Sequence, residues 1–187
     1  MRISTTGVGP SEWGGDALVL FVPEGRMDLL DQLGPEAAAP AKEKASRLKY
    51  TGKEDSILAV ELERGPVGSV YLAGLGGGGA PLPLDRWRRG VALAVRQAGK
   101  DRRVKMMALP GEAATPEVAS ALAEGALLAE YGFEKYKTQV EPAEKPEPLE
   151  ELLVHGADGA SLEKGSLRAA AQNYARDLAN EPGNVIS

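Results

Sequence analysis

Hydrophobic residues along this chain occur in two patterns, short continuous runs and longer runs with helical spacing. A short apolar run that ends at proline or glycine is typical of a strand buried on both faces. Apolar residues that recur every three or four positions predict a helix with one buried face. The continuous runs predict strands at Asp16–Val22, Ser56–Glu61, Ser69–Gly74, Val104–Leu109 and Leu149–Val154.

Helical patterns lie between these strands. The segment Thr115–Tyr131 opens with a hydroxyl residue followed by proline, which is a typical helix start. Asp85 is the expected cap of another helix, and Met27–Leu33 predicts a short one. By contrast, Glu36–Lys44 shows no clear apolar face, so we expect an exposed helix or a loop there.

Strands and helices therefore alternate, which requires crossover connections between the strands. We expect an α/β fold of three layers, with a mostly parallel sheet and helices on both faces. A last helix, Ser166–Asn180, presents an apolar stripe that needs a partner, and an exposed stripe of that size favours self-association. The stripe consists of Leu167, Ala171, Tyr174 and Leu178.

Composition places the chain among ordinary globular proteins. Its 187 residues predict one domain plus an appendage. The chain contains no cysteine, so disulfides and thiolate metal sites are excluded, and this agrees with a reducing compartment. The first residues lack the apolar stretch of a secretory signal, and no run approaches the about 20 apolar residues of a membrane helix. We expect a cytoplasmic protein without membrane contact.

Charge is unevenly distributed along the chain. The formal net charge of −5 argues against a general nucleic-acid scaffold. A basic stripe nevertheless runs from Arg86 to Arg103 and is rich in arginine. One interpretation is a binding surface for phosphate backbones. The other is a solvated helix face whose arginines pair with acidic residues elsewhere in the fold.

A glycine-rich segment, Gly74–Gly79, follows a predicted strand and formally satisfies the G-x-G-x-x-G pattern through Gly74, Gly76 and Gly79. A dinucleotide site also needs a helix that opens at the loop, so that its N-terminus faces the pyrophosphate. Here Ala80–Leu84 intervenes. These glycines are therefore weak candidates for nucleotide binding, and a flexible turn is the alternative.

No catalytic or metal-binding constellation is evident from the residues themselves. His155 is the only histidine, so a triad or metal cluster that needs histidine would depend on it alone. It lies among turn-forming residues directly after a predicted strand, which favours an exposed loop position. We therefore predict no catalytic residue, no metal ligand and no cofactor in this chain.

Two segments resemble the leucine (cytosol) aminopeptidase family of two-metal peptidases. One is Ala123–Thr138, which includes Glu-Gly-Ala-Leu-Leu-Ala and Phe-Glu-Lys-Tyr-Lys, and the other is Asn173–Asn184, which reads Asn-Tyr-Ala-Arg-Asp-Leu-Ala-Asn-Glu-Pro-Gly-Asn. Tyr50–Glu54 and Gly74–Gly76 add weaker similarity. The resemblance covers most of the chain in order.

The resemblance implies an α/β N-terminal domain, similar to macro domains, that precedes a larger catalytic domain. The family's enzymes use two divalent ions, zinc or manganese, to remove N-terminal amino acids, and the active form is a hexamer. Its metal ligands lie around an Asn-Thr-Asp-Ala-Glu-Gly-Arg signature that does not occur here. Residues 1–155 would then be the N-terminal domain, and residues 156–187 a linker helix and the start of an absent catalytic domain.

Three hypotheses follow. The first is a non-catalytic N-terminal domain with a structural and assembly role, whose partner is the missing catalytic domain. Its interdomain contacts would come from Leu167, Tyr174, Leu178, Asn180, Pro182 and Asn184. The second is a nucleotide- or nucleic-acid-binding module that uses Gly74–Gly79 or the Arg86–Arg103 stripe. The third, an enzyme complete on this chain, conflicts with the lack of a metal-ligand set.

Overall fold

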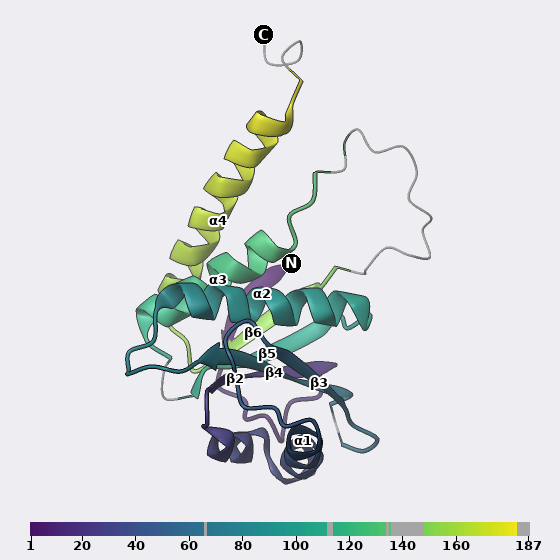
Figure 1. Ribbon diagram of the computed structural model, residues 1–187. Helices are drawn as coiled ribbons and strands as arrows, with labels where there is room; N and C mark the ends of the chain where they lie inside the picture. Colours follow the sequence, from purple (N-terminus) through teal and green to yellow (C-terminus); the bar gives the residue numbers. More distant parts are fainter. Residues whose placement is uncertain (66, 112–113, 134, 136–147, 183–187) are drawn as a thin grey trace.

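The computed structural model describes residues 1–65, 67–111, 114–133, 135 and 148–182. These residues contain a six-stranded sheet in the order β1-β6-β5-β2-β4-β3 (Figure 1). All neighbouring strands are parallel except β3 and β4. The strands are β1 (Arg2–Thr6), β2 (Ala17–Pro23), β3 (Ile57–Glu61), β4 (Ser69–Gly76), β5 (Lys105–Leu109) and β6 (Glu151–His155). The predicted α/β fold with a mostly parallel sheet is confirmed.

Helices cover both faces of this sheet, as predicted. Figure 1 shows η1 and α1 below the sheet, and α2, α3 and α4 above it. Their bounds are η1 (Met27–Leu33, a 3₁₀ helix), α1 (Pro35–Arg47), α2 (Leu84–Lys100), α3 (Pro116–Ala129) and α4 (Gly159–Asn180). The molecule therefore has three layers.

Strand β2 lies in the middle of the sheet and separates two hydrophobic cores. Ala17, Val19 and Phe21 belong to the core beneath α2 and α3. Leu18 and Leu20 point the other way, into the core beneath η1 and α1. Because successive side chains of a strand point to opposite faces, a run without polar residues is what two covered faces require.

Helix α1 differs from the prediction made for Glu36–Lys44. One of its faces is buried against the sheet rather than exposed. The buried residues are all alanines, namely Ala37, Ala38, Ala41 and Ala45. Alanine contributes little to an amphipathic pattern, but its small side chain lets a helix lie close to a sheet. The prediction of an exposed segment was therefore wrong for this face.

Strand β1 was not predicted. Its sequence, Arg2–Thr6, is largely polar, because it forms the edge of the sheet and only one side of it meets the core. It pairs in parallel with β6, so that Arg2 lies opposite Glu151 and Thr6 opposite His155. An edge strand of this kind carries too few apolar residues for a clear sequence signal.

The helix starts agree with the prediction in one case and differ in two. Thr115 caps α3, and its hydroxyl accepts a hydrogen bond from the Val118 amide at 3.3 Å. Helix α2 begins two residues earlier than expected, at Leu84, so Asp85 lies in its first turn rather than at its cap. Helix α4 begins at Gly159, with Asp158 as its cap. Its first turns complete the core, where Leu162 is buried.

Candidate functional site

Gly74 and Gly76 lie among the last three residues of β4 and pack against the segment that precedes β3. A Cβ atom on Gly74 would lie 2.0 Å from the Lys53 carbonyl oxygen. Gly76 has a φ of 74°, and a Cβ atom there would lie 2.8 Å from Glu54 Cβ. These two glycines therefore allow a close approach of two backbone segments. Gly79, by contrast, is exposed, and no atom lies within 4 Å of the place that a Cβ atom would take there.

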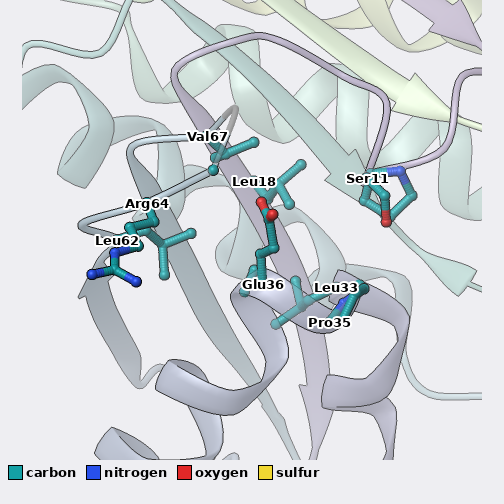
Figure 2. A pocket seen from close by; sticks show the side chains of 12 residues that line it. Ser11, Leu18, Leu33, Pro35, Glu36, Leu62, Arg64 and Val67 are labelled. Atoms are coloured by element: carbon teal, nitrogen blue, oxygen red, sulfur yellow. The ribbon is translucent and has the colours of Figure 1, made fainter.

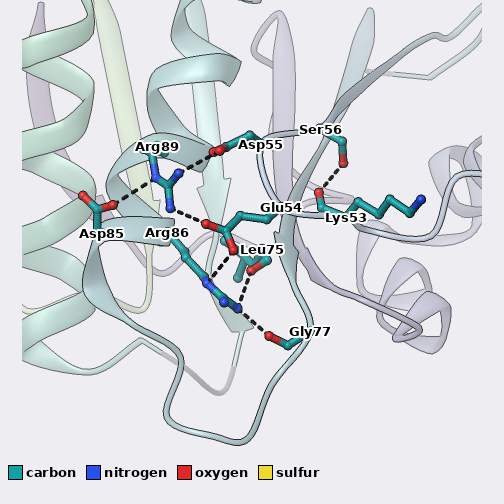
Figure 3. A network of polar contacts seen from close by, with 9 residues as sticks. All are labelled: Lys53, Glu54, Asp55, Ser56, Leu75, Gly77, Asp85, Arg86 and Arg89. Atoms are coloured by element: carbon teal, nitrogen blue, oxygen red, sulfur yellow. Dashed lines mark hydrogen bonds and ion pairs between the residues drawn. The ribbon is translucent and has the colours of Figure 1, made fainter.

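Arg86 lies beside this glycine segment and binds its backbone (Figure 3). Its Nη1 donates to the carbonyl oxygens of Leu75, at 3.2 Å, and Gly77, at 2.5 Å. Its Nε also pairs with Glu54 Oε2 at 2.9 Å. A side chain of α2 thus adds polar contacts to the backbone hydrogen bonds that Gly74 and Gly76 make with Ser56, Gly52 and Glu24. This arrangement was not evident from the sequence, because Arg86 and Glu54 come from separate elements.

Arg89 extends the same network by one helical turn. It pairs with Glu54, with Asp55 Oδ2 at 2.7 Å and with Asp85 Oδ2 at 3.0 Å (Figure 3). The hydrogen bond to Glu54 raises the pKa of Arg89, and the nearby carboxylates add to this effect. Three carboxylates therefore surround one guanidinium beside the carboxyl end of β4.

Other arginines of the Arg86–Arg103 stripe are also paired. Arg88 Nε lies 3.0 Å from Glu124 Oε2, on α3. Arg103 Nη2 lies 2.6 Å from Glu61 Oε2, on β3. The second interpretation of the stripe, arginines that pair with acidic residues elsewhere in the fold, thus holds for Arg86, Arg88, Arg89 and Arg103. Their charge is largely balanced by these carboxylates.

A cavity of about 270 Å³ lies at the opposite end of the sheet, between the start of β2 and the first turn of α1 (Figure 2). Leu18, Leu33 and Val67 give it an apolar floor. In Figure 2 the carboxylate of Glu36 points toward Leu18, whereas Arg64 points away from it. No pattern in the sequence indicates this cavity, because its lining comes from segments that lie far apart along the chain.

His155 is the last residue of β6 and is half-buried beside β1, rather than in the exposed loop that its neighbours favoured. Among the described residues there is no group of three or more histidine, cysteine, aspartate or glutamate side chains that could hold a metal ion. A two-ion centre needs such a cluster of ligands. The described part of the chain therefore does not fit one.

Helix α4 exposes the stripe that the sequence predicted. The side chains of Leu167, Tyr174 and Leu178 are 66%, 67% and 43% exposed, whereas the side of α4 that faces α3 buries Ala169. The helix projects from the domain with its C-terminal end free of the sheet (Figure 1). In its described part, this chain has no helix long and apolar enough to span a bilayer.

Three further residues were predicted for interdomain contact, and of these Asn180 is the last residue of α4. Asn180 Nδ2 donates to the Tyr131 hydroxyl at 3.3 Å, and Pro182 is exposed. Asn184 lies outside the described residues. Tyr131 was not singled out in the sequence, although it falls within the segment Ala123–Thr138 that resembles the aminopeptidases.

One known protein family has a model that matches this chain. A family model described as "Cytosol aminopeptidase family, N-terminal domain" matches residues 30–140, which is more than half of the chain. The chain belongs to the cytosol aminopeptidase family. It corresponds to the N-terminal domain of that family, in agreement with the resemblance seen in the sequence.

Curated relatives of this aminopeptidase-family domain are considerably longer than the chain. A probable cytosol aminopeptidase of Aquifex aeolicus is 35% identical over 94% of this chain and 36% of its own length. One from Microcystis aeruginosa is 30% identical over 100% of this chain and 39% of its own length. The chain thus spans little more than a third of the curated relatives that it matches.

Solved structures show the same fold. A mutant of tomato leucine aminopeptidase superposes with a TM-score of 0.73 at 20% identity, over 99% of this chain and 39% of the tomato chain. The bottromycin maturation enzyme BotP in complex with Mn gives a TM-score of 0.69 at 22% identity, over 92% of this chain and 33% of that chain. These likenesses establish the architecture of the aminopeptidase-family domain.

Proposed function

We propose that this chain is the non-catalytic N-terminal domain of a metal-dependent leucine aminopeptidase, with a structural and assembly role. Family membership supports the first part of the proposal, because the matching family model is that of the N-terminal domain. The shares of 36% and 39% of the relatives' lengths agree with a polypeptide that contains a second, larger part. In this proposal residues 1–155 are the domain and residues 156–187 lead into the second part.

The observation that carries the structural role is the outward stripe of α4. Leu167, Tyr174 and Leu178 are 43% to 67% exposed and lie on one side of the helix. Burial of a large apolar side chain stabilises an assembly by about 1.5–3 kcal/mol. A row of three on a helix that projects from its own domain therefore favours a docked state. We assign the remainder of the polypeptide as the occupant, because the chain spans only 36% of a curated relative and the matching family model is described as that of an N-terminal domain.

The peptidase chemistry would reside in that remainder. Two divalent ions, zinc or manganese, would there generate a hydroxide near neutral pH and polarise the scissile carbonyl. The presence of Mn in the related BotP structure agrees with this choice of metal. Assembly into a hexamer and a cytoplasmic location belong to the same proposal, and the family's name agrees with the location.

The gene's product in its own cells provides the test. An antibody raised against this 19.6 kDa chain should detect a band of more than twice that mass. The protein purified with that antibody should release leucine from a leucine anilide when manganese is supplied. A band at 19.6 kDa alone, or a longer product without this activity, would contradict the proposed parent enzyme.

The structural role is tested by three substitutions in the same full-length product, Leu167→Gln, Tyr174→Gln and Leu178→Gln. We expect the assembled mass, measured by light scattering after gel filtration, to fall, with activity lost in proportion. Leu48→Gln is the matched control, because Leu48 is 56% exposed at the far end of α1. Unchanged assembly in the triple variant would show that the stripe is not an interdomain contact.

A further inference from the structure

The two halves of α4 are held to the domain in different ways. The first half is packed into the fold, with Leu162, Gly165 and Ala169 buried. Gly165 crosses α3 so closely that a Cβ atom there would lie 2.1 Å from the Ser120 carbonyl oxygen. Beyond Ala169 no residue of α4 is buried. The second half of the helix is therefore not held by apolar packing against its own domain.

Polar contacts hold this second half instead. One long contact reaches α3, where Asn173 Nδ2 donates to the Leu127 carbonyl oxygen at 3.5 Å, and the others reach the segment after α3. The Tyr131 hydroxyl donates to Asp177 Oδ1 at 2.8 Å and accepts from Asn180 Nδ2 at 3.3 Å. The Arg176 guanidinium lies 5.3 Å from the centre of the Tyr131 ring, within the range of a cation–π contact. Lys135 Nζ adds an ion pair with Glu181 Oε1 at 2.6 Å. One tyrosine thus contacts three residues across the last turns of α4.

We propose that Tyr131 is a positioning residue that sets the direction in which α4, and the chain that follows it, leaves the domain. The direction of α4 is a property of this domain alone, whereas its effect on a following domain rests on the proposed function. From Ala169 to Asn180 the helix extends about 16 Å. A tilt of about 20° around Ala169, the last buried residue of the helix, would move its end by about 6 Å. Close-packed side chains respond to changes as small as one methylene group, so a displacement of this size would disrupt a packed interface.

The direction of α4 can be measured in this chain directly, because the sequence contains no cysteine. Spin labels on Ala179→Cys and Arg96→Cys, both at exposed positions, report the distance between the end of α4 and α2 by pulsed electron resonance. With Tyr131 present we expect one narrow distance distribution. Tyr131→Ala should broaden it and shift it by about 5 Å. Tyr131→Phe keeps the ring over Arg176 but loses both hydroxyl bonds, so a smaller broadening is expected.

Tyr174→Ala is the matched control, because it removes the same residue type from the exposed side of α4, away from the contacts of Tyr131. It should leave the distance distribution unchanged. If Tyr131→Ala does not fold, the pair Asp177→Ala and Asn180→Ala removes the hydroxyl's partners without touching Tyr131 and should give the broadening expected for Tyr131→Phe. A narrow, unshifted distribution in folded Tyr131→Ala, or in this pair, would overturn the inference. Failure of the docking experiment above would leave it intact, since the distance is measured within one domain.

Discussion

Replacement of Gly165 by alanine tests the crossing of α3 and α4. Inside an ordinary helix, glycine is about 0.5–1 kcal/mol less favourable than alanine, so sequence alone predicts a more stable protein. The structure predicts the opposite, because the new Cβ atom would lie 2.1 Å from Ser120 O, 2.9 Å from Ser120 C and 3.0 Å from Ala123 Cβ. Two of these three neighbours are backbone atoms, so rotation of a side chain cannot relieve the contact.

The two helices must therefore separate by about 1 Å, which weakens the packing of every residue along their interface. Overpacking of this kind costs about 1–3 kcal/mol. After the gain in helix propensity we expect Gly165→Ala to lower the free energy of unfolding by about 1–2 kcal/mol. For a domain of this size that corresponds to a fall in the melting temperature of about 2–8 °C.

Urea unfolding followed by circular dichroism measures this change. Gly159→Ala is the control, because Gly159 lies in the same helix, has a negative φ and has no atom within 4 Å of its Cβ position. We expect this variant to be as stable as the parent or slightly more so. If Gly165→Ala were also as stable as the parent, the close crossing of α3 and α4 deduced from the structure would be refuted.

Three further predictions concern ionisation, the loop network and nucleic acid. Burial raises the pKa of Tyr50 from 10.0 to about 12, so the folded state favours the neutral phenol, and Tyr50 should contribute stability that is constant below pH 10 and falls by up to about 2–3 kcal/mol towards pH 12. Burial and the hydrogen bond to Asp101 also raise the pKa of Tyr71, which adds a decline of its own over the same pH range. Tyr50→Phe should therefore remove only the Tyr50 part of the decline measured in unfolding titrations, and an identical decline in that variant would contradict the assignment. Arg86→Met should lower stability by about 1–2 kcal/mol, since it removes the partner of Glu54 Oε2 and the donor to the carbonyls of Leu75 and Gly77, while Arg96→Met, at an exposed position, should have little effect. Fluorescence anisotropy should detect no binding of a DNA duplex in low salt, because four arginines of the stripe are paired with carboxylates and the net charge of the chain is −5; a salt-dependent affinity would reverse that conclusion.

The central strands and α3 could be predicted from sequence because their signals are local. Strand β2 is buried on both faces, so every position from Ala17 to Val22 is apolar. The start of α3 depends on the hydroxyl of Thr115 and the proline beside it, which act within one turn. Family membership also followed from the sequence, because the segments that carry it are continuous.

Helix α1 and strand β1 could not be predicted in the same way. The buried face of α1 is made of alanines, and their burial depends on how close the sheet lies. Strand β1 carries little apolar pattern and exists because β6 offers it an edge with matching register. In both cases the decisive partner is far away in the sequence.

The glycines show most clearly the difference between what local sequence predicts and what contacts between distant segments decide. Gly74, Gly76 and Gly79 formed one motif in the sequence, yet the first two permit backbone contact with residues 52–54 and the third lies in open solvent. The chain by itself determined its family, its α/β architecture and the apolar stripe on its last helix, because each depends on the order and spacing of neighbouring residues. Tertiary structure alone decided which arginines are paired, where the cavity lies and how Tyr131 holds α4, because those contacts join side chains that only the folded backbone brings together.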